Sequence, residues 1–164
     1  MLAAFPGTRV ALLNSGAVRR DLKPGRVSAD DIMEVLPFAN TLVLLDLTGA
    51  ELKAALEEHM AFLLRRFPDQ TIPPAPYVAG ITFSLRPGAP LGERVCDLSV
   101  RDASGTFKAM EPRAVYRTVV NAFMAGGGDH FKTLKAAKAF RVDTGMIDQD
   151  VFREHLKRLG SFGN

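Results

Sequence analysis

Two loops that follow expected strands carry polar residues that could contact a small ligand. In the first loop, Asn14 comes directly after the apolar run Val10 to Leu13, and Gly16 and Arg19 follow it. An asparagine amide offers a donor and an acceptor, and an arginine guanidinium forms charge-assisted hydrogen bonds to hydroxyl or phosphate oxygens. The same residue types more commonly form an Asx-turn and a surface ion pair, so both uses stay open.

The second loop is a run of three glycines that ends in an acidic residue. Gly126, Gly127 and Gly128 precede Asp129 and come after the β-branched run Val115 to Val120. Glycines let the backbone adopt a positive φ and approach a ligand closely. No Gly-Lys-Ser/Thr sequence follows, so the run is not a phosphate-binding P-loop. Composition alone favours a tight turn in which Asp129 caps the next helix, and a ligand-binding loop is the alternative.

Two phenylalanines lie beside polar residues at the ends of expected elements. Phe38 follows Pro37 and precedes Asn40 by two residues, and Phe123 comes shortly before the glycine run. A phenylalanine is usually a core residue. Binding sites, however, are commonly built where elements end and loops begin. Both phenylalanines are therefore candidates for ligand contact.

The chain carries no recognised motif for metal binding or nucleophilic catalysis. His59, His130 and His155 are scattered, without HExxH spacing, and we interpret His59 and His155 as ordinary helix residues. Cys96 is the only cysteine, which excludes an intrachain disulfide and a CxxC motif. No serine or cysteine lies in a nucleophile-elbow context. We expect no cofactor in this chain and no complete catalytic apparatus.

Composition and charge indicate a single globular domain of 164 residues, with 47% hydrophobic and 24% charged residues. The formal net charge is +3, and without a long basic run no nucleic-acid polymer is expected as a partner. No apolar run approaches the roughly 20 residues of a membrane span, so we expect no membrane partner. The first residues lack a basic region, and Pro6 and Gly7 interrupt them, so we expect no signal peptide there.

Strand and helix patterns occur without strict alternation, which favours an α+β fold. Two helix starts are expected at Ser28, with Asp31 three residues on, and at the capping box of Thr48 and Glu51. The expected strands are Val10–Leu13, Thr41–Leu47, Tyr77–Leu85, Arg94–Arg101 and Val115–Val120. The expected helices run from Ser28 to Pro37, from Thr48 through Leu64, over Phe131–Ala139 and over Ile147–Leu159, and a proline-rich loop covers Phe67–Pro76.

Five segments, in this order, resemble those of the C-terminal domains of 5'-nucleotidases, UDP-sugar hydrolases and 2',3'-cyclic phosphodiesterases. Residues Asn14–Arg19 are similar to the family's Asn-Gly-Gly-Gly-Ile-Arg loop, and Leu36–Asn40 resemble its Pro-Phe-x-Asn element. Residues Leu47–Leu52 resemble its Leu-Thr-Gly-x-Glu-Leu helix start. Residues Asn121–Phe131 are similar to its Asn-x-Phe-x-x-x-Gly-Gly-Asp-Gly-Phe/Tyr signature, and Thr144–Asp148 match its last strand-to-helix junction.

The resemblance implies a layered mixed sheet with packed helices and a site for the base and ribose of a nucleotide. Phe38 and Phe123 would sandwich the base, and such stacking is worth roughly 1–3 kcal/mol per base. Asp129 would bind the ribose hydroxyls. The remaining positions implied to bind the substrate are Asn14, Gly16, Arg19, Asn40 and Gly127.

The chain departs from the family at three places. Ala17 replaces a glycine of the first motif, and His130 replaces the glycine that usually follows the aspartate. Only about a dozen residues precede Asn14, where the family carries roughly a helix and a strand, including an arginine that joins the ribose contacts. We expect residues 1–164 to form one substrate-binding domain without this helix. The apolar surface so exposed would favour self-association into a homo-oligomer.

The resemblance also implies that substrate binding and phosphate hydrolysis lie in separate domains. A separate N-terminal metallophosphoesterase domain with two divalent metal ions would hydrolyse the phosphate, and the isolated chain would be inactive. The parent protein would be periplasmic or extracellular. One alternative is a non-catalytic oligomerisation or interaction module. Another is the substrate domain of a related hydrolase, acting on nucleotide sugars, cyclic nucleotides or sulfur compounds. The phenylalanine pair argues against the sulfur compounds, which carry no base.

Overall fold

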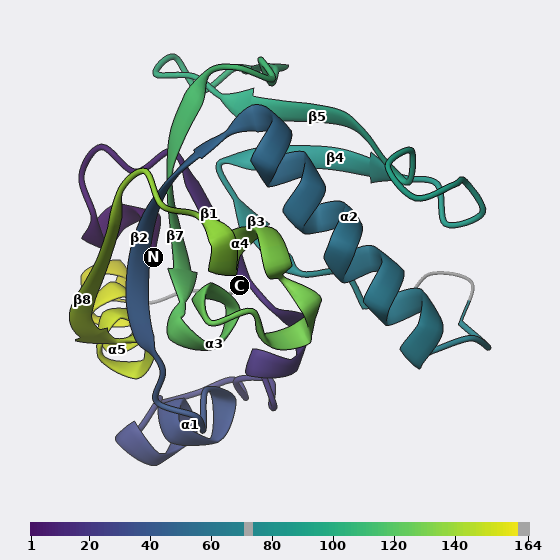
Figure 1. Ribbon diagram of the computed structural model, residues 1–164. Coiled ribbons are helices and arrows are strands. Elements are labelled where there is room, and N and C mark those ends of the chain that lie inside the picture. The colour runs from purple at the N-terminus through teal and green to yellow at the C-terminus, as the bar shows by residue number, and fades with distance from the viewer. Residues whose placement is uncertain (71–73, 161–164) are drawn as a thin grey trace.

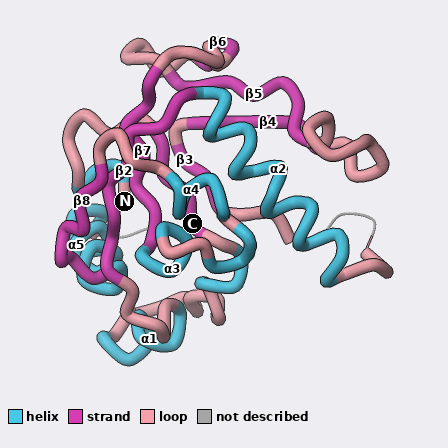
Figure 2. Tube along the Cα trace, in the orientation of Figure 1, coloured by secondary structure: helices cyan, strands magenta, loops and turns pink. Residues whose placement is uncertain are grey.

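The computed structural model describes residues 1–70 and 74–160, and its elements are shown in Figure 1 and Figure 2. The strands are β1 (Val10–Leu13), β2 (Thr41–Thr48), β3 (Tyr77–Ala79), β4 (Ile81–Leu85), β5 (Val95–Arg101), β6 (Phe107–Ala109), β7 (Val115–Asn121) and β8 (Arg141–Ile147). The α-helices are α1 (Ala29–Val35), α2 (Gly49–Arg66), α3 (Ala122–Ala125), α4 (Lys132–Ala136) and α5 (Asp148–Leu159). Short 3₁₀ turns are η1 (Leu2–Ala4), η2 (Ser15–Ala17) and η3 (Gly128–His130).

The strands form two sheets. The larger sheet has five strands in the order β3-β1-β7-β2-β8, and the smaller one has three in the order β4-β5-β6. In the larger sheet β1 runs parallel to β7, whereas the other neighbours are antiparallel. The predicted α+β class with a mixed sheet is therefore confirmed.

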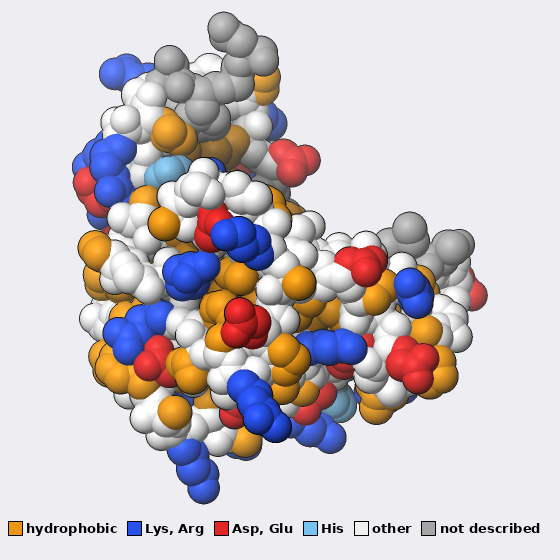
Figure 3. Space-filling model, turned by 90° about the horizontal axis from the view of Figure 1, so that it is seen from above, with side chains coloured by type: hydrophobic (Ala, Val, Ile, Leu, Met, Phe, Trp, Pro, Cys, Tyr) orange, Lys and Arg blue, Asp and Glu red, His pale blue; other side chains and the backbone are white. Residues whose placement is uncertain are grey.

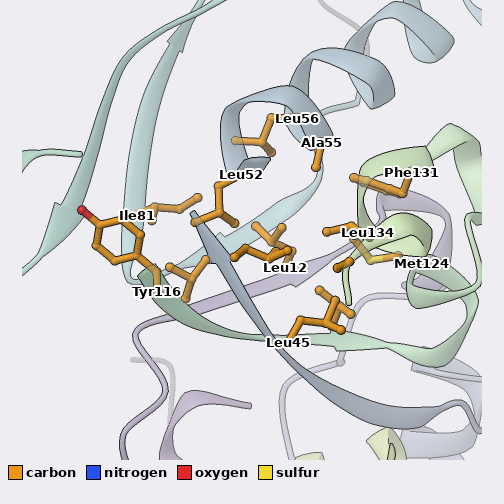
Figure 4. Packing of buried hydrophobic residues seen from close by; sticks show 14 of the residues in the cluster. Leu12, Leu45, Leu52, Ala55, Leu56, Ile81, Tyr116, Met124, Phe131 and Leu134 are labelled. Atoms are coloured by element: carbon orange, nitrogen blue, oxygen red, sulfur yellow. The ribbon is translucent and has the colours of Figure 1, made fainter. Parts of the chain in front are cut away.

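Helix α2 covers one face of the larger sheet and carries the main core. The alternating residues Val43, Leu45 and Leu47 of β2 belong to the same buried cluster as Leu52 and Leu56 of α2. Figure 4 shows the α2 side chains directed toward the strands, with residues of α3 and α4 beside them. The loop between α3 and α4 is thereby fixed against α2, which matters for the site described below.

Helix α5 lies on the other side of β2 (Figure 1). There, Leu42 and Val119 pack with Val151 of α5 and with Phe5, which follows the turn η1. The segment before β1 thus covers part of this face. The expected self-association through exposed apolar surface stays a prediction.

Both expected helix starts are confirmed as capping boxes. The Ser28 hydroxyl accepts a bond from the Asp31 N–H at 3.2 Å, and the Asp31 carboxylate accepts one from the Ser28 N–H at 2.7 Å. Thr48 and Glu51 exchange the same pair of bonds at the start of α2. These reciprocal bonds satisfy N–H groups that a helix leaves without partners at its first turn.

The expected strand Tyr77–Leu85 is in fact two strands in different sheets. Gly80 separates them with φ +80, and a Cβ at this position would overlap the backbone oxygen of Arg9. Glycine tolerates both the positive φ and the close approach. The chain therefore leaves the larger sheet after β3 and enters the smaller sheet as β4.

Other differences concern short or exposed elements. The helix expected over Phe131–Ala139 is only α4, and the exposed edge strand β6 was not expected. The edge strand β8 was indicated only by the resemblance of Thr144–Asp148 to the family's strand-to-helix junction. The expected loop Phe67–Pro76 begins where α2 ends, and its residues 71–73 lie outside the described part of the chain. Edge strands with polar or charged side chains lack the apolar alternation by which buried strands are recognised.

The surface shows no large field of one charge on the face drawn in Figure 3, where acidic and basic side chains are interspersed with scattered hydrophobic ones. Within residues 1–70 and 74–160, no helix has both the length and the apolar character needed to cross a bilayer.

Candidate functional site

A cavity of about 240 Å³ lies where three loops of the larger sheet meet. It is lined by Asn14, Gly16, Ala17, Phe38, Asn40, Phe123 and Asp129. The loops follow β1, connect α1 to β2, and connect α3 to α4. Six of the eight residues predicted to bind the substrate are thus brought together from segments that are far apart in the sequence.

Two larger hollows lie elsewhere and have a different character. One, of about 470 Å³, is an apolar groove between α2 and the smaller sheet. The other, of about 710 Å³, lies between the loop before α1 and α5. Among the residues that the structure describes, neither hollow has an aromatic side chain in its lining. The smaller cavity is therefore the stronger candidate site, because aromatic surface and convergent polar groups are typical of sites for small organic ligands.

The cavity presents two exposed phenyl rings. Phe38 is 60% exposed and Phe123 is 46% exposed, although a phenylalanine side chain is normally buried. Covering exposed aromatic rings in a cavity with a flat apolar group is favourable, because that group removes the rings from water.

Phe38 is held in place by the start of α5. The N–H of Asp148 donates to the backbone oxygen of Asn40 at 2.9 Å, and the amide of Gln149 donates to the backbone oxygen of Leu36 at 2.7 Å. Ala39 between them has φ +48, a conformation that a non-glycine residue adopts only when its surroundings enforce it. The loop is therefore fixed on both sides of the phenyl ring.

Phe123 is held by the short helix α3 and by Gly128. The side chain of Asn121 caps α3 by accepting a bond from the Met124 N–H at 2.9 Å. A Cβ on Gly128 would overlap the ring of Phe123. Gly128 has no positive φ, so its role is close approach and not backbone conformation.

A chain of hydrogen bonds orders the polar side of the cavity. The amide nitrogen of Asn121 donates to the amide oxygen of Asn14 at 3.0 Å, and the amide nitrogen of Asn14 donates to Asp129 at 2.8 Å. An ionised carboxylate only accepts, so Asn14 presents its NH₂ group to Asp129. Asn121 and Asn14 are buried, so the polar side chains more accessible at the cavity are the Asp129 carboxylate and the Asn40 amide.

The interpretation of Asp129 as a helix cap is wrong. Helix α4 has no side-chain cap from its own N-terminal residue, and the N–H of Thr133 donates instead to Glu58 of α2 at 2.9 Å. The Asp129 carboxylate turns to Asn14 because the backbone is left-handed here, with φ +49 at Asp129 and +64 at His130. The Asx-turn considered for Asn14 is likewise replaced by this contact.

Arg19 and Gly127 do not line the cavity. The Arg19 side chain is exposed, and its backbone N–H donates to the oxygen of Val35 at 2.9 Å. Gly127 adopts φ +92 and forms the turn that leads into η3. Their direct contact with a ligand stays a prediction.

His59 is more than the ordinary helix residue expected from the sequence. It is fully buried, and its Nδ1 lies 3.0 Å from the backbone oxygen of Asp129. Burial lowers the pKa of His59, and the hydrogen bond and the charge of Asp129 oppose this effect. The available signal was its place on α2: His59 follows Leu52 and Leu56 at helical spacing, on the face that enters the core.

The metal-ligating side chains of the described residues do not converge. In the ranges 1–70 and 74–160, no three His, Cys, Asp or Glu side chains are placed to hold one metal ion. The cavity itself offers two amides, a carboxylate and two phenyl rings. This set can bind a ligand with a flat ring and neighbouring hydroxyls.

Comparison with known proteins identifies the family of this chain. The family model described as "5'-nucleotidase, C-terminal domain" matches residues 2–136. The chain is 38% identical over 152 residues to the probable 5'-nucleotidase of Treponema pallidum (strain Nichols), a match that covers 91% of this chain and 25% of that protein.

Solved structures agree with this result. The 5'-nucleotidase precursor from Thermus thermophilus superposes with a TM-score of 0.84 at 38% identity, over 96% of this chain and 30% of that one. The sulfate thiohydrolase SoxB from the same species superposes with a TM-score of 0.70 at 26% identity, over 96% of this chain and 27% of that one. The chain thus spans less than a third of each of these relatives. It belongs to the family of 5'-nucleotidase C-terminal domains.

Proposed function

We propose that the cavity binds the base and ribose of a nucleoside 5'-phosphate. The observation that carries the proposal is the convergence of Phe38, Phe123 and Asp129 on one cavity. The two exposed rings suit the faces of a base, since stacking tolerates any base. The Asp129 carboxylate, fixed by Asn14, suits the two neighbouring hydroxyls of a ribose, which donate hydrogen bonds to it.

In this proposal the phosphate chemistry belongs to another part of the parent protein. A metallophosphoesterase domain, N-terminal to this chain and holding two divalent metal ions, would cleave the phosphate of a nucleotide whose base is held here. Binding the base and ribose then supplies position and orientation, which convert an encounter of two reactants into a reaction within one complex. Such a protein would act in nucleotide catabolism outside the cytoplasm.

The proposal is tested by calorimetric titration of the chain with adenosine and with AMP. We expect binding with a dissociation constant of ~1 mM or tighter. Replacement of Phe123 by alanine should weaken binding at least about tenfold, because stacking contributes roughly 1–3 kcal/mol. The matched control is Phe107→Ala, since Phe107 is a similarly exposed ring (48%) on β6 and outside the cavity. Absence of binding to the folded wild type, or equal binding by Phe123→Ala, would reject the proposal.

A second candidate is suggested by the similarity to the sulfate thiohydrolase. A domain that serves sulfur compounds has no base to hold, so the phenyl pair would be without a ligand. Titration with adenosine separates the two candidates, because only a nucleotide-binding domain should bind it. Thiosulfate in the same titration is the control for the second candidate.

A further inference from the structure

His59 is a buried titratable side chain that takes no part in the cavity lining, yet contacts the residue that does. Its ring on α2 is fully buried, and Nδ1 lies 3.0 Å from the backbone oxygen of Asp129. A carbonyl oxygen only accepts, so Nδ1 carries the proton. Within the described chain, Nε2 is buried without a partner, which is consistent with a neutral ring.

Asp129 needs such a partner because its backbone conformation is unfavourable. Two successive non-glycine residues, Asp129 and His130, have positive φ, a sparsely populated conformation that persists only where the surrounding structure enforces it. This conformation also directs the Asp129 carboxylate to Asn14 at 2.8 Å, at the edge of the cavity. The hydrogen bond from His59 ties the strained peptide to α2.

The neighbours of His59 extend this support along the loop. The imidazole stacks on the ring of Phe131, with centroids 4.4 Å apart and planes inclined by 18°. The adjacent Glu58 accepts bonds from the N–H and the hydroxyl of Thr133, at 2.9 and 3.0 Å. Consecutive residues of α2 therefore hold both ends of the segment from Asp129 to Thr133.

We propose that His59 is a positioning residue for the nucleoside: its Nδ1–H holds the Asp129 peptide so that the carboxylate faces the ribose. His59 itself touches no ligand. The inference rests on the proposed function, because it assigns a role in the same cavity. It also makes a statement about the loop that holds without any ligand, namely that the donor at Nδ1, and not the volume of the ring, maintains the conformation.

Two variants separate the donor from the ring. His59→Asn keeps an N–H donor close to the position of Nδ1 and loses the ring. His59→Phe keeps a ring that can stack on Phe131 and loses the donor. We expect His59→Phe to weaken adenosine binding about tenfold, the loss of roughly one hydrogen bond, and His59→Asn to stay within about threefold of the wild type. His155→Phe, on α5 and outside the cavity, is the control.

The opposite order would overturn the inference. If His59 only fills space, His59→Phe binds like the wild type and His59→Asn is the weaker one. Thermal unfolding of each variant shows whether a loss of binding reflects a loss of folded protein.

Hydrogen exchange provides a result that needs no ligand. The N–H of Phe131 donates to the oxygen of Gly128 at 3.2 Å across the loop, so its exchange rate reports on loop opening. We expect this amide to exchange about tenfold faster in His59→Phe than in His59→Asn. If the wild type binds no adenosine, the proposed function fails, and this comparison still decides on the role of His59. Equal exchange in the two variants would refute it.

Discussion

At the scale of single residues, the site depends on residues that contact no ligand themselves but fix the positions of the cavity's side chains. Asn121 caps α3 with its oxygen and orients Asn14 with its nitrogen, so one buried amide serves both the aromatic and the polar side of the cavity. Gly128 leaves the space that the ring of Phe123 occupies. These residues act through geometry, and their replacement should affect binding more than folding.

Replacement of Gly128 by alanine tests this role. The added methyl group would displace the ring of Phe123, while the backbone at this position, which has no positive φ, accepts alanine. We expect adenosine binding to weaken about tenfold, within the range of a lost stacking contact, with little change in the midpoint of thermal unfolding. Gly88→Ala is the control, because a Cβ there meets nothing within 4 Å. Unchanged binding by Gly128→Ala would show that the ring position does not matter.

The titration of His59 should make stability depend on pH in a defined direction. Burial lowers its pKa in the folded state, so the unfolded chain takes up a proton first as the pH falls through about 6.5. The unfolded state then binds more protons, and the free energy of unfolding decreases from pH 6.5 toward the lower folded pKa.

Denaturant unfolding of the wild type and of His59→Asn at pH 7.5 and 5.5 measures this effect. The other titrating groups are common to both proteins, so the wild type should lose more stability than the variant at the lower pH. Parallel losses would mean that His59 is not desolvated in the folded state.

At the scale of elements, helix starts and buried strands are predictable from the sequence, whereas their tertiary partners are not. Ser28 and Thr48 are recognisable because a capping box is satisfied within four residues of chain. The strand β8 cannot be recognised by apolar alternation because it is an exposed edge with charged side chains, and only the family resemblance indicates where it ends. The contact of His59 with Asp129 spans 70 positions in the sequence, and nothing local encodes such a distance.

The candidate site, too, was predictable from the sequence only in part. Its residues could be identified by motif, and the structure brings six of the eight together. Composition alone misassigned Asp129 as a helix cap, because the competing partner, Asn14, lies 115 positions away. A side chain with local and remote partners of similar chemistry is placed by the fold and not by its neighbours in sequence.

The first turn of α5 should control the position of Phe38. Gln149 donates to the backbone oxygen of Leu36, and its replacement by alanine removes one of the bonds that fix the loop. We expect about threefold weaker adenosine binding, as one hydrogen bond between neutral groups contributes roughly 0.5–1.5 kcal/mol. Gln70→Ala, at an exposed position after α2, provides the comparison. If Gln149→Ala and Gln70→Ala change adenosine binding equally, α5 does not control the position of Phe38.

At the scale of the whole molecule, the proposed function makes this chain a domain that binds the substrate for a reaction carried out elsewhere in a longer protein. Its cavity lies at the ends of strands of the larger sheet, and the loops around it are held by α2 through His59 and by α5 through Gln149. The relatives described above are more than three times as long as this chain, so they contain further segments in which the proposed phosphate chemistry could lie.

This division predicts binding without turnover. The isolated chain, incubated with AMP and Mn²⁺ or Zn²⁺, should release no phosphate above the rate without protein. The physical reason is that no three potential metal ligands converge in the described ranges. Phosphate release that is abolished by a chelator would place a metal centre within this chain and contradict the division of labour.

The most direct test of the central claim is to map the adenosine site by nuclear magnetic resonance of the isotope-labelled chain. The ring current of a bound base shifts the signals of nearby protons, so we predict the largest changes at Phe38, Phe123 and Asp129. Signals from the two larger hollows, represented by Leu98 and Arg153, should stay unchanged. Changes centred on either of those hollows, or no changes at all in the folded protein, would contradict the assignment of this cavity as a nucleoside site.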